Sequence, residues 1–481
     1  MPKNLFGTTE KSNFILNMKP AALQKLTGIM LMLCIIVPQI GNFFIAGLDG
    51  NSALLGTFLY LSGFGSILVF IIAMLKKEQT FKENPSYWLI IFMAVWAFAS
   101  YYSVVLSANA DFDPVFASEL ISTAMLGEYG RYEGLLSILA YFGIFLLATT
   151  VKNKKTITML MDIAVGCGII QGVIAVLQHI PNFDFLTDYA DMRETLALRD
   201  VMLSSGLSDS PIFYGSFLTI VTGIAFSGAV FDKNLTRARI YGGAVWLFWL
   251  TGLFTSSIVP IIGIGCVTVI TAIAVLLDRK KGGTKFENGL FKTAAARFLV
   301  LLGGIAVIFA VVFLVQGIYI RDRAIAYQDG FARLLIITGY VPNETASLYE
   351  IGFEKSMHLI KTDPIFGAGP DCMAKMLSLT EDLILNSLDR SYNEYLYVAA
   401  TRGIPSAIAF AAFAVYVVRR GFVGLKGFVS DSSEWYRPAA AAAVAAYAVQ
   451  AFFSASSVTV APLFWLFCGI ICAKSIDKAV K

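Results

Sequence analysis

The stretch ALLGTFLYLSGFGSILVFIIAML, residues 53–75, decides the fold class of this protein. Its 23 residues include no charged side chain. A helix of roughly 20 apolar residues spans the hydrocarbon core of a bilayer. Because lipid offers no partner to exposed peptide groups, a spanning segment of this kind has to be helical. The stretch therefore predicts a transmembrane helix.

Similar runs recur along all 481 residues, of which 57% are hydrophobic and 15% are charged. Soluble domains have about 25% charged residues, so this composition excludes a soluble globular protein. We predict an all-α fold, a polytopic bundle of about twelve transmembrane helices. The predicted spans are Leu26–Leu48, Ala53–Leu75, Tyr87–Ser107, Leu135–Val151, Ile157–His179, Ile212–Phe231, Ile240–Phe254, Pro260–Leu277, Phe298–Ile320, Ile404–Val418, Pro438–Phe453 and Val458–Ala473.

The charges between these runs predict their orientation. With the N-terminus inside, the cytoplasmic segments hold 26 of the 37 Lys and Arg residues, and the outer loops hold 23 of the 33 Asp and Glu residues. Basic residues near span ends resist translocation, so both termini are predicted in the cytoplasm. The polar first 25 residues predict an uncleaved start rather than a signal peptide. We expect the inner basic loops to attract anionic membrane lipids and not nucleic acid.

This topology divides the chain into three parts. Residues 1–320 hold spans one to nine with the outer loops 108–134 and 181–211, residues 321–403 form one large outer loop, and residues 404–481 hold the last three spans and a cytoplasmic tail. A loop of about eighty residues far exceeds what a connection needs and is usually functional or disordered. Aromatic and aliphatic residues favour order here. Of the six cysteines only Cys372 lies outside the spans, so no disulfide framework is predicted.

Polar chemistry is expected in the outer loops, because Asp162 is the one clear charged residue inside a predicted span. At the entrance of the fourth span, Arg131 and Glu133 stand between Gly130 and Gly134. This pattern fits a site for an anionic group as well as it fits an interfacial anchor.

Two further outer segments precede the tenth span. Residues 351–362, closed by Asp363 and Pro364, predict an amphipathic helix on the membrane face, followed by a tight turn at Gly367 and Gly369. In residues 389–405 a helix would place Arg390, Asn393, Glu394 and Tyr397 on one face, with Arg402 on an adjoining stripe. Such a face fits an anion site, and it also fits ion pairing that only solvates the helix.

Together these segments resemble the O-antigen ligase and O-antigen polymerase family, whose members join lipid-linked glycans at the outer face of the bacterial membrane. The resemblance covers most of the chain. Its motifs are RYEGL at 131–135, SDSPIFYG at 208–215, DPIFGAGPD at 363–371, NEYL at 393–396 and GIP at 403–405.

The resemblance implies a multi-pass protein of the bacterial inner (plasma) membrane. It would act as a ligase or polymerase, a glycosyltransferase that moves a glycan from a polyprenyl diphosphate carrier to a glycan or lipid acceptor. Guanidinium groups can stabilise the departing diphosphate, so we expect no metal and no cofactor. The expected substrate-binding residues are Arg131, Arg193, Arg390, Asn393, Arg402, Gly367 and Gly369. The candidate catalytic residues are Glu394, Tyr392, His358 and Glu133.

Three positions depart from the family pattern. Tyr392 stands where the family usually has His, Tyr349 stands near a common Arg, and Ser256-Ser257-Ile258 replaces a usual Ser-Arg-Gly. A tyrosine is a poor base near neutral pH, because its reference pKa is about 10. A second hypothesis is therefore a non-catalytic relative that binds the same lipid-linked glycan. A third is a flippase or exporter of a cell-envelope polysaccharide, which would need an aqueous path to the cytoplasmic side.

Overall fold

The computed structural model is all-helical, as the sequence predicts. It describes residues 19–41, 52–76, 84–128, 131–180, 204–208, 210–255, 257–280, 282–286, 292–324, 342–377, 390–428 and 434–473. Among these residues the only β pairing is an isolated bridge between Lys285 and Thr293. The helices are α2 Pro20–Ile36, the π-helix η2 Val37–Gly41, α4 Ser52–Leu75, α5 Ser86–Asp111, α6 Pro114–Leu126, α7 Leu135–Ala148, α8 Lys154–Gln178, α10 Pro211–Phe231, α11 Leu235–Phe254, α12 Ile258–Lys280, α13 Ala294–Ala324, α15 Pro342–Thr362, α16 Met373–Leu377, α17 Glu394–Phe428, α18 Tyr436–Gln450 and α19 Ala461–Ile471.

Each predicted span overlaps a helix of the structure, and the first overlaps both α2 and η2. In the part of the chain that is described, eight helices are long and apolar enough to cross a membrane, as expected of a multi-pass membrane protein. The other four predicted spans contain α7, α11, α18 and α19, which are shorter or less apolar than these eight helices. That all twelve segments cross, and the side on which each loop lies, stay predictions.

Two elements differ from the expected pattern. The thirteen-residue helix α6 lies inside the stretch expected as a loop. Helix α17 begins at Glu394, ahead of the expected start at Ile404, because the outer segment and the tenth span form one interrupted helix. Helix α15 ends at Thr362, directly before Asp363 and Pro364, where the sequence predicts an end. Its placement on a membrane face stays a prediction.

Short polar side chains fix where several helices begin. Asp113 accepts hydrogen bonds from the amides of two residues in the first turn of α6, at 3.0 and 3.2 Å. Asn153, Ser210 and Asn234 cap α8, α10 and α11 in the same way. Each cap satisfies N–H groups that the helix leaves without a carbonyl partner. These capping residues thereby set where α6, α8, α10 and α11 begin.

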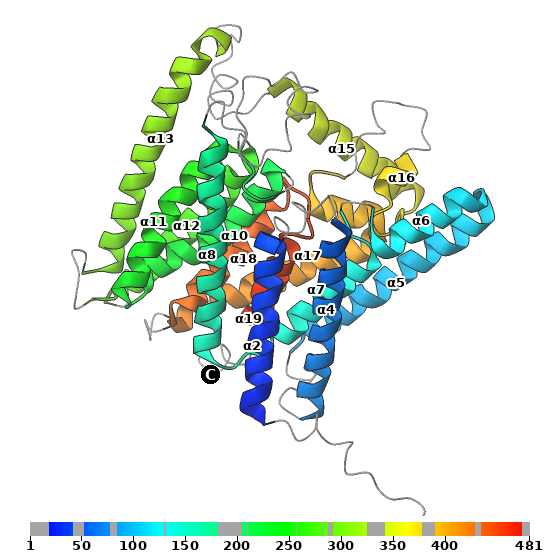
Figure 1. Ribbon diagram of the computed structural model, residues 1–481, viewed down its shortest axis with the longest axis horizontal. Helices are drawn as coiled ribbons and strands as arrows, with labels where there is room; N and C mark the ends of the chain where they lie inside the picture. The colour runs from blue at the N-terminus through cyan, green and yellow to red at the C-terminus, as the bar shows by residue number, and fades with distance from the viewer. Residues whose placement is uncertain are drawn as a thin grey trace, which may run out of the picture.

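Small residues hold the bundle together. A Cβ atom on Gly63 of α4 would lie 2.2 Å from the Cβ of Ala140 of α7, and one on Gly223 of α10 would lie 2.6 Å from the backbone of Ala443. Close backbone approach of this kind is the usual basis of helix association in membranes. Helix α10 is buried between α8, α11, α12 and the alanine-rich α18, while α15 and α16 lie at one end of the bundle (Figure 1).

The charged residue that the sequence places within a span is paired. The carboxylate of Asp162 on α8 accepts a hydrogen bond from the Tyr241 hydroxyl at 2.7 Å and forms an ion pair with Arg237 at 3.0 Å. Both partners are on α11. This cluster lies in the first halves of α8 and α11, and none of its three residues lines the cavity described next.

Candidate functional site

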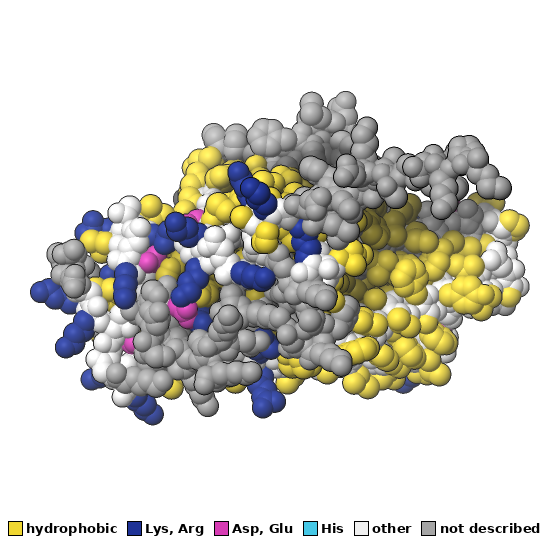
Figure 2. All heavy atoms as spheres, turned by 90° about the horizontal axis from the view of Figure 1, so that it is seen from below, with side chains coloured by type: hydrophobic (Ala, Val, Ile, Leu, Met, Phe, Trp, Pro, Cys, Tyr) yellow, Lys and Arg dark blue, Asp and Glu magenta, His cyan; other side chains and the backbone are white. Residues whose placement is uncertain are grey.

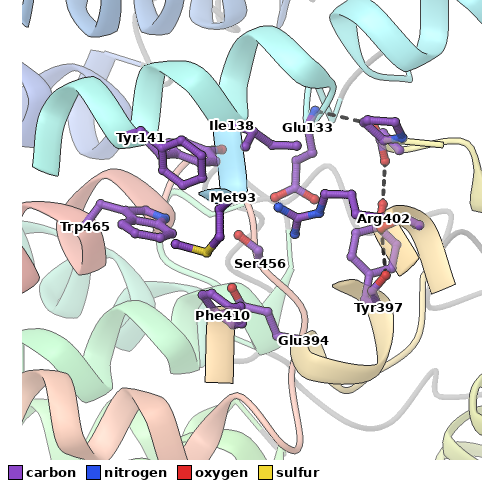
Figure 3. Close-up of a pocket in the computed structure, with 14 residues that line it drawn as sticks. Met93, Glu133, Ile138, Tyr141, Glu394, Tyr397, Arg402, Phe410, Ser456 and Trp465 are labelled. Atoms are coloured by element: carbon purple, nitrogen blue, oxygen red, sulfur yellow. Dashed lines mark hydrogen bonds between the residues drawn. The ribbon is translucent and has the colours of Figure 1, made fainter. Parts of the chain in front are cut away.

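A small, buried cavity lies near the end of the bundle that carries α15 and α16. Its volume is about 40 Å³, which admits a few water molecules or a hydroxyl group but not a sugar ring. Its lining comes from five regions far apart in the sequence: Met93; Glu133, Ile138, Tyr141 and Phe142; Pro370 and Asp371; Glu394, Tyr397, Thr401, Arg402 and Phe410; and Ser456 and Trp465. Figure 3 shows these side chains directed toward one another from several helices.

A tight reversal between α6 and α7 carries Glu133 to the cavity. Gly127 has a φ of +94°, and a Cβ atom there would lie 2.3 Å from the amide nitrogen of Glu133. A Cβ atom on Gly134 would lie 2.3 Å from the amide nitrogen of Gly127. Only glycine fits at these two positions, so Gly127 and Gly134 allow the chain to turn back closely on itself between α6 and α7.

Asp371 joins three of the contributing regions. Its buried carboxylate forms an ion pair with Arg131 at 2.8 Å and accepts a hydrogen bond from the Tyr397 hydroxyl at 2.8 Å. It also accepts from the amide of Glu128 at 2.8 Å and from that of Glu133 at 3.4 Å. A buried charge with this many donors is well stabilised. Arg131, expected to bind substrate, therefore serves first to hold the loop of Asp371.

Backbone strain gathers in the same loops. Tyr132 has a φ of +53° and Asp371 a φ of +56°, and they are the only non-glycine residues with positive φ in the described ranges. The left-handed conformation costs roughly 1–2 kcal/mol for such residues. Strain of this kind persists where the surrounding structure imposes it, and it clusters at functional sites.

Glu133 is the least compensated charge of the site. Its side chain is 6% exposed, and neither carboxylate oxygen has a hydrogen-bond partner in the described structure. The nearest cation is Arg390, whose Nη1 lies 3.6 Å from Oε2. Burial raises the pKa of Glu133 to about 8, although Arg390 acts in the opposite direction. A carboxyl with a pKa near neutrality can exchange a proton with a bound group.

Arg390 is held in place by the chain on its other side. Its Nη1 donates to the carbonyl oxygen of Ser456 at 2.8 Å, and its guanidinium lies 4.8 Å from the ring centroid of Phe213. The motif opening α10 therefore contributes an aromatic support. The Nη1 of Arg390 is thereby oriented toward both the Ser456 carbonyl and Glu133.

Glu394 and Arg402 face the cavity from the first part of α17. The carboxylate of Glu394 accepts a hydrogen bond from the Tyr447 hydroxyl of α18 at 3.1 Å. Arg402 has no ion pair within the described residues and points into the space that Glu133 also faces (Figure 3). Besides the engaged carboxylate of Asp371, the cavity thus presents the carboxyl groups of Glu133 and Glu394 and the guanidinium of Arg402.

The segment 363–369 closes around a break in α17. Gly403 has a φ of +79°, and a Cβ atom there would lie 1.9 Å from the carbonyl oxygen of Ile365. The amides of Ala368 and Gly369 donate to the carbonyls of Ala400 and Thr401 at 2.8 and 2.9 Å. The segment therefore satisfies the helix end that the break leaves unpaired, and it fixes the direction of the preceding Arg402.

Aromatic rings close the cavity on the side of the helix bundle. Trp465 lines the cavity and stacks on Phe413, with ring centroids 5.0 Å apart. Phe413 in turn meets Phe145 edge-on at 5.3 Å, and both are fully buried. The charged groups are thereby held above a packed apolar layer, where electrostatic interactions are stronger than in water.

The remaining expected residues lie around the cavity rather than in it. Asn393 caps α17 by accepting from the amide of Leu396 at 3.0 Å. Tyr392 packs against the apolar cluster of Leu359, Met373 and Leu377. His358 is exposed on α15 and does not line the cavity.

The two predicted glycines shape the loop rather than offer free amides. Gly367 has a φ of +71° and Gly369 one of +103°, and both amides already donate to carbonyl oxygens of the protein. Arg193 lies outside the described residues. The roles assigned to these residues in substrate binding stay predictions.

Sequence reasoning missed several residues of the site. Asp371 was visible as the acid that ends the DPIFGAGPD motif, but the sequence does not show that Arg131, 240 positions away, is its partner. Tyr447 and Trp465 sit in apolar runs that look like ordinary spans. Only their contacts with Glu394 and the cavity distinguish them.

Metal ligands do not cluster in the described part of the chain. No group of three or more His, Cys, Asp or Glu residues is close enough there to hold an ion. A scan against models of known protein families and a search of curated proteins found no match to this chain.

Proposed function

We propose that the protein is a membrane glycosyltransferase, a ligase or polymerase that moves a glycan from a polyprenyl diphosphate carrier to an acceptor at the outer face of the bacterial inner membrane. The observation that carries this proposal is that the buried Glu133 and Glu394 and the half-buried Arg402 line one cavity at the predicted outer end of the bundle. The motifs that resemble the O-antigen ligase and polymerase family supply the substrate class.

In the proposed reaction an acceptor hydroxyl attacks the anomeric carbon of the donor sugar. A new carbon–oxygen bond forms, the bond to the diphosphate breaks, and its electron pair leaves with the diphosphate. The ionised form of Glu133, which is the minor form at neutral pH because the pKa is about 8, takes the proton of the attacking hydroxyl. Arg402, supported by Arg390, stabilises the charge that grows on the leaving group.

The packing of the described residues does not favour an exporter. An exporter needs a path for a polar chain between the two sides of the membrane. Below the cavity the described residues are packed aromatic rings, among them the fully buried Phe145 and Phe413. This packing supports chemistry at one face of the membrane.

Two observations favour a second candidate, a non-catalytic protein that binds the same carrier. Arg131 is engaged by Asp371, and Tyr392, which stands where the family usually has His, packs against Leu359, Met373 and Leu377 and does not line the cavity. The cavity of about 40 Å³ has no room for a sugar ring, which applies to both candidates. For catalysis the loops around the cavity must move apart when the donor binds.

A reconstitution experiment separates the two candidates. The purified protein in lipid nanodiscs is given oligosaccharides on polyprenyl diphosphate, and product is measured by mass spectrometry. The glycosyltransferase predicts a transferred or lengthened glycan. Glu133→Gln and Arg402→Gln should lower the rate by about 100-fold or more.

Glu119→Gln is the matched control, because Glu119 is exposed on α6 and does not line the cavity. Its rate should equal that of the wild type. Carrier binding without turnover across a broad donor set would overturn the catalytic proposal and support the binding protein.

A further inference from the structure

A second hollow lies at the opposite end of the bundle, between α11 and α13. Its volume is about 350 Å³. Four lining positions of α11, Leu235, Ala238, Gly242 and Trp246, follow one another at helical spacing and form a single face. Arg297, Val300 and Leu301 of α13 form the opposite wall. We call this hollow the α11–α13 groove.

The groove is open because glycines, which have no side chain, line part of it. A Cβ atom built on Gly243 would meet nothing within 4 Å. Higher up, the helices close on each other, since a Cβ atom on Gly304 would lie 2.2 Å from the indole nitrogen of Trp246. The distance along α13 from Arg297 to this crossing is about 10 Å, from a rise of about 1.5 Å per residue. The groove is therefore an apolar slot with one closed end.

Two arginines stand at its other end. Arg239 is exposed, and Arg297 is only 7% exposed. The Nη1 of Arg297 donates to the carbonyl oxygen of Asp232 at 2.7 Å, and its guanidinium stacks 3.5 Å from the ring centroid of Phe286. Its Nη2 finds no acceptor in the described part of the chain. A buried guanidinium with an unused donor calls for an anionic oxygen.

The surroundings of the groove match a lipid. Ile240 and Leu299 beside it are 54% and 66% exposed, as expected for residues that face acyl chains. Figure 2 views the end of the bundle where α11 and α13 begin, and Lys and Arg side chains gather on the half where these helices lie. The predicted topology places this end at the cytoplasmic leaflet, where anionic lipids concentrate.

We infer that the α11–α13 groove binds one anionic phospholipid, with its phosphate on Arg239 and Arg297 and the upper part of one acyl chain along Gly243. The site is independent of the cavity at Glu133. It gives the protein a requirement for anionic lipid on the side of the membrane opposite to the proposed reaction.

Native mass spectrometry of the purified full-length protein tests this inference. Phosphatidylglycerol is compared with phosphatidylcholine of the same acyl chains. The wild type should retain phosphatidylglycerol better, and Arg239→Gln should weaken its retention by about fivefold, the effect of one basic residue at a lipid surface. Inorganic phosphate in excess should not displace the lipid, and displacement would identify a site for free phosphate instead.

Filling the slot tests the position of the acyl chain. Gly243→Leu should abolish the preference, because the new side chain occupies the groove. Gly265→Leu on α12 is the matched control, since it also has nothing within 4 Å but does not line the groove. Equal retention of phosphatidylglycerol by Gly243→Leu and Gly265→Leu would overturn the inference, and so would equal retention by Arg239→Gln and the wild type.

Discussion

At the scale of single residues, the site depends on buried charges whose partners lie far away in the sequence. Asp371 is fully buried and holds Arg131, whose side chain is 9% exposed. Removing one member of such a pair leaves the other charge buried without compensation. We expect Asp371→Asn to lower the free energy of unfolding by about 3–5 kcal/mol. Equilibrium unfolding in mixed micelles measures this change.

An exposed pair on the same side of the molecule provides the control. Lys375 and Glu119 approach to 3.3 Å, and the Glu119 side chain is 57% exposed. Exposed pairs contribute about 0–1 kcal/mol, so Glu119→Gln should change stability little. Equally small losses from both substitutions would show that Asp371 does not hold the site together.

The raised pKa of Glu133 predicts how the free energy of unfolding depends on pH. Its pKa is raised from 4.5 to about 8, so the folded protein keeps a proton that the unfolded chain releases. This contribution to stability is complete below about pH 4.5 and is lost as the pH rises through about 8. Glu133→Gln keeps the shape of the neutral group and does not titrate. Its unfolding temperature should therefore fall less than that of the wild type between about pH 5 and pH 9.

The comparison is made by thermal unfolding in detergent at a series of pH values. Both proteins share every other titrating group, so only the difference between their curves reports on Glu133. Parallel curves would contradict the raised pKa.

At the scale of elements, the break in α17 places Arg402 at the cavity. Gly403 combines a positive φ with a contact that leaves no space for a Cβ atom. Gly403→Ala should destabilise the protein by about 1–3 kcal/mol, the usual cost of such strain, and should disturb the Arg402 side of the site. Gly166→Ala on α8 is the control, because it has open space and a helical conformation.

Helix propensity predicts that Gly166→Ala is neutral or stabilising by up to about 1 kcal/mol. Both variants are compared by unfolding in mixed micelles and by turnover with a lipid-linked donor. If Gly403→Ala behaved like Gly166→Ala, the loop 363–369 would not need its close contact with the helix break.

The sequence predicted most of the helices because lipid leaves an apolar run few alternatives. It did not predict α6, which has only thirteen residues, contains Glu119 and is too short to span. It also began the tenth span at Ile404 and treated a helix over residues 389–405 as a separate outer segment, whereas both belong to the interrupted helix α17. Gly403 interrupts this helix, and the interruption is stabilised by contacts with residues 364–369 that no local pattern shows.

At the scale of the whole molecule, the fold brings together segments that the sequence marked one at a time. Glu133, Glu394 and Arg402 could be predicted because charged residues next to apolar spans are costly and rarely incidental. Tyr397 could be placed on the same helix face as Glu394, but its hydrogen bond to Asp371 and the ion pair of Asp371 with Arg131 could not be predicted, since each joins segments far apart in the sequence. The cavity at Glu133 and the α11–α13 groove lie at opposite ends of the bundle, so the two ends of the molecule differ chemically.

This polarity predicts which positions can be labelled from outside the cell. His358 on α15 and Lys285, between α12 and α13, are both exposed. Helix α15 and the beginning of α13 lie at opposite ends of the bundle (Figure 1). A membrane-impermeant maleimide on intact cells should label His358→Cys and not Lys285→Cys, and permeabilised cells should show both. The six native cysteines are free, and five of them are buried, so the unmodified protein sets the background. The reverse pattern would put the cavity in the cytosol, where it could not meet a donor in the outer leaflet.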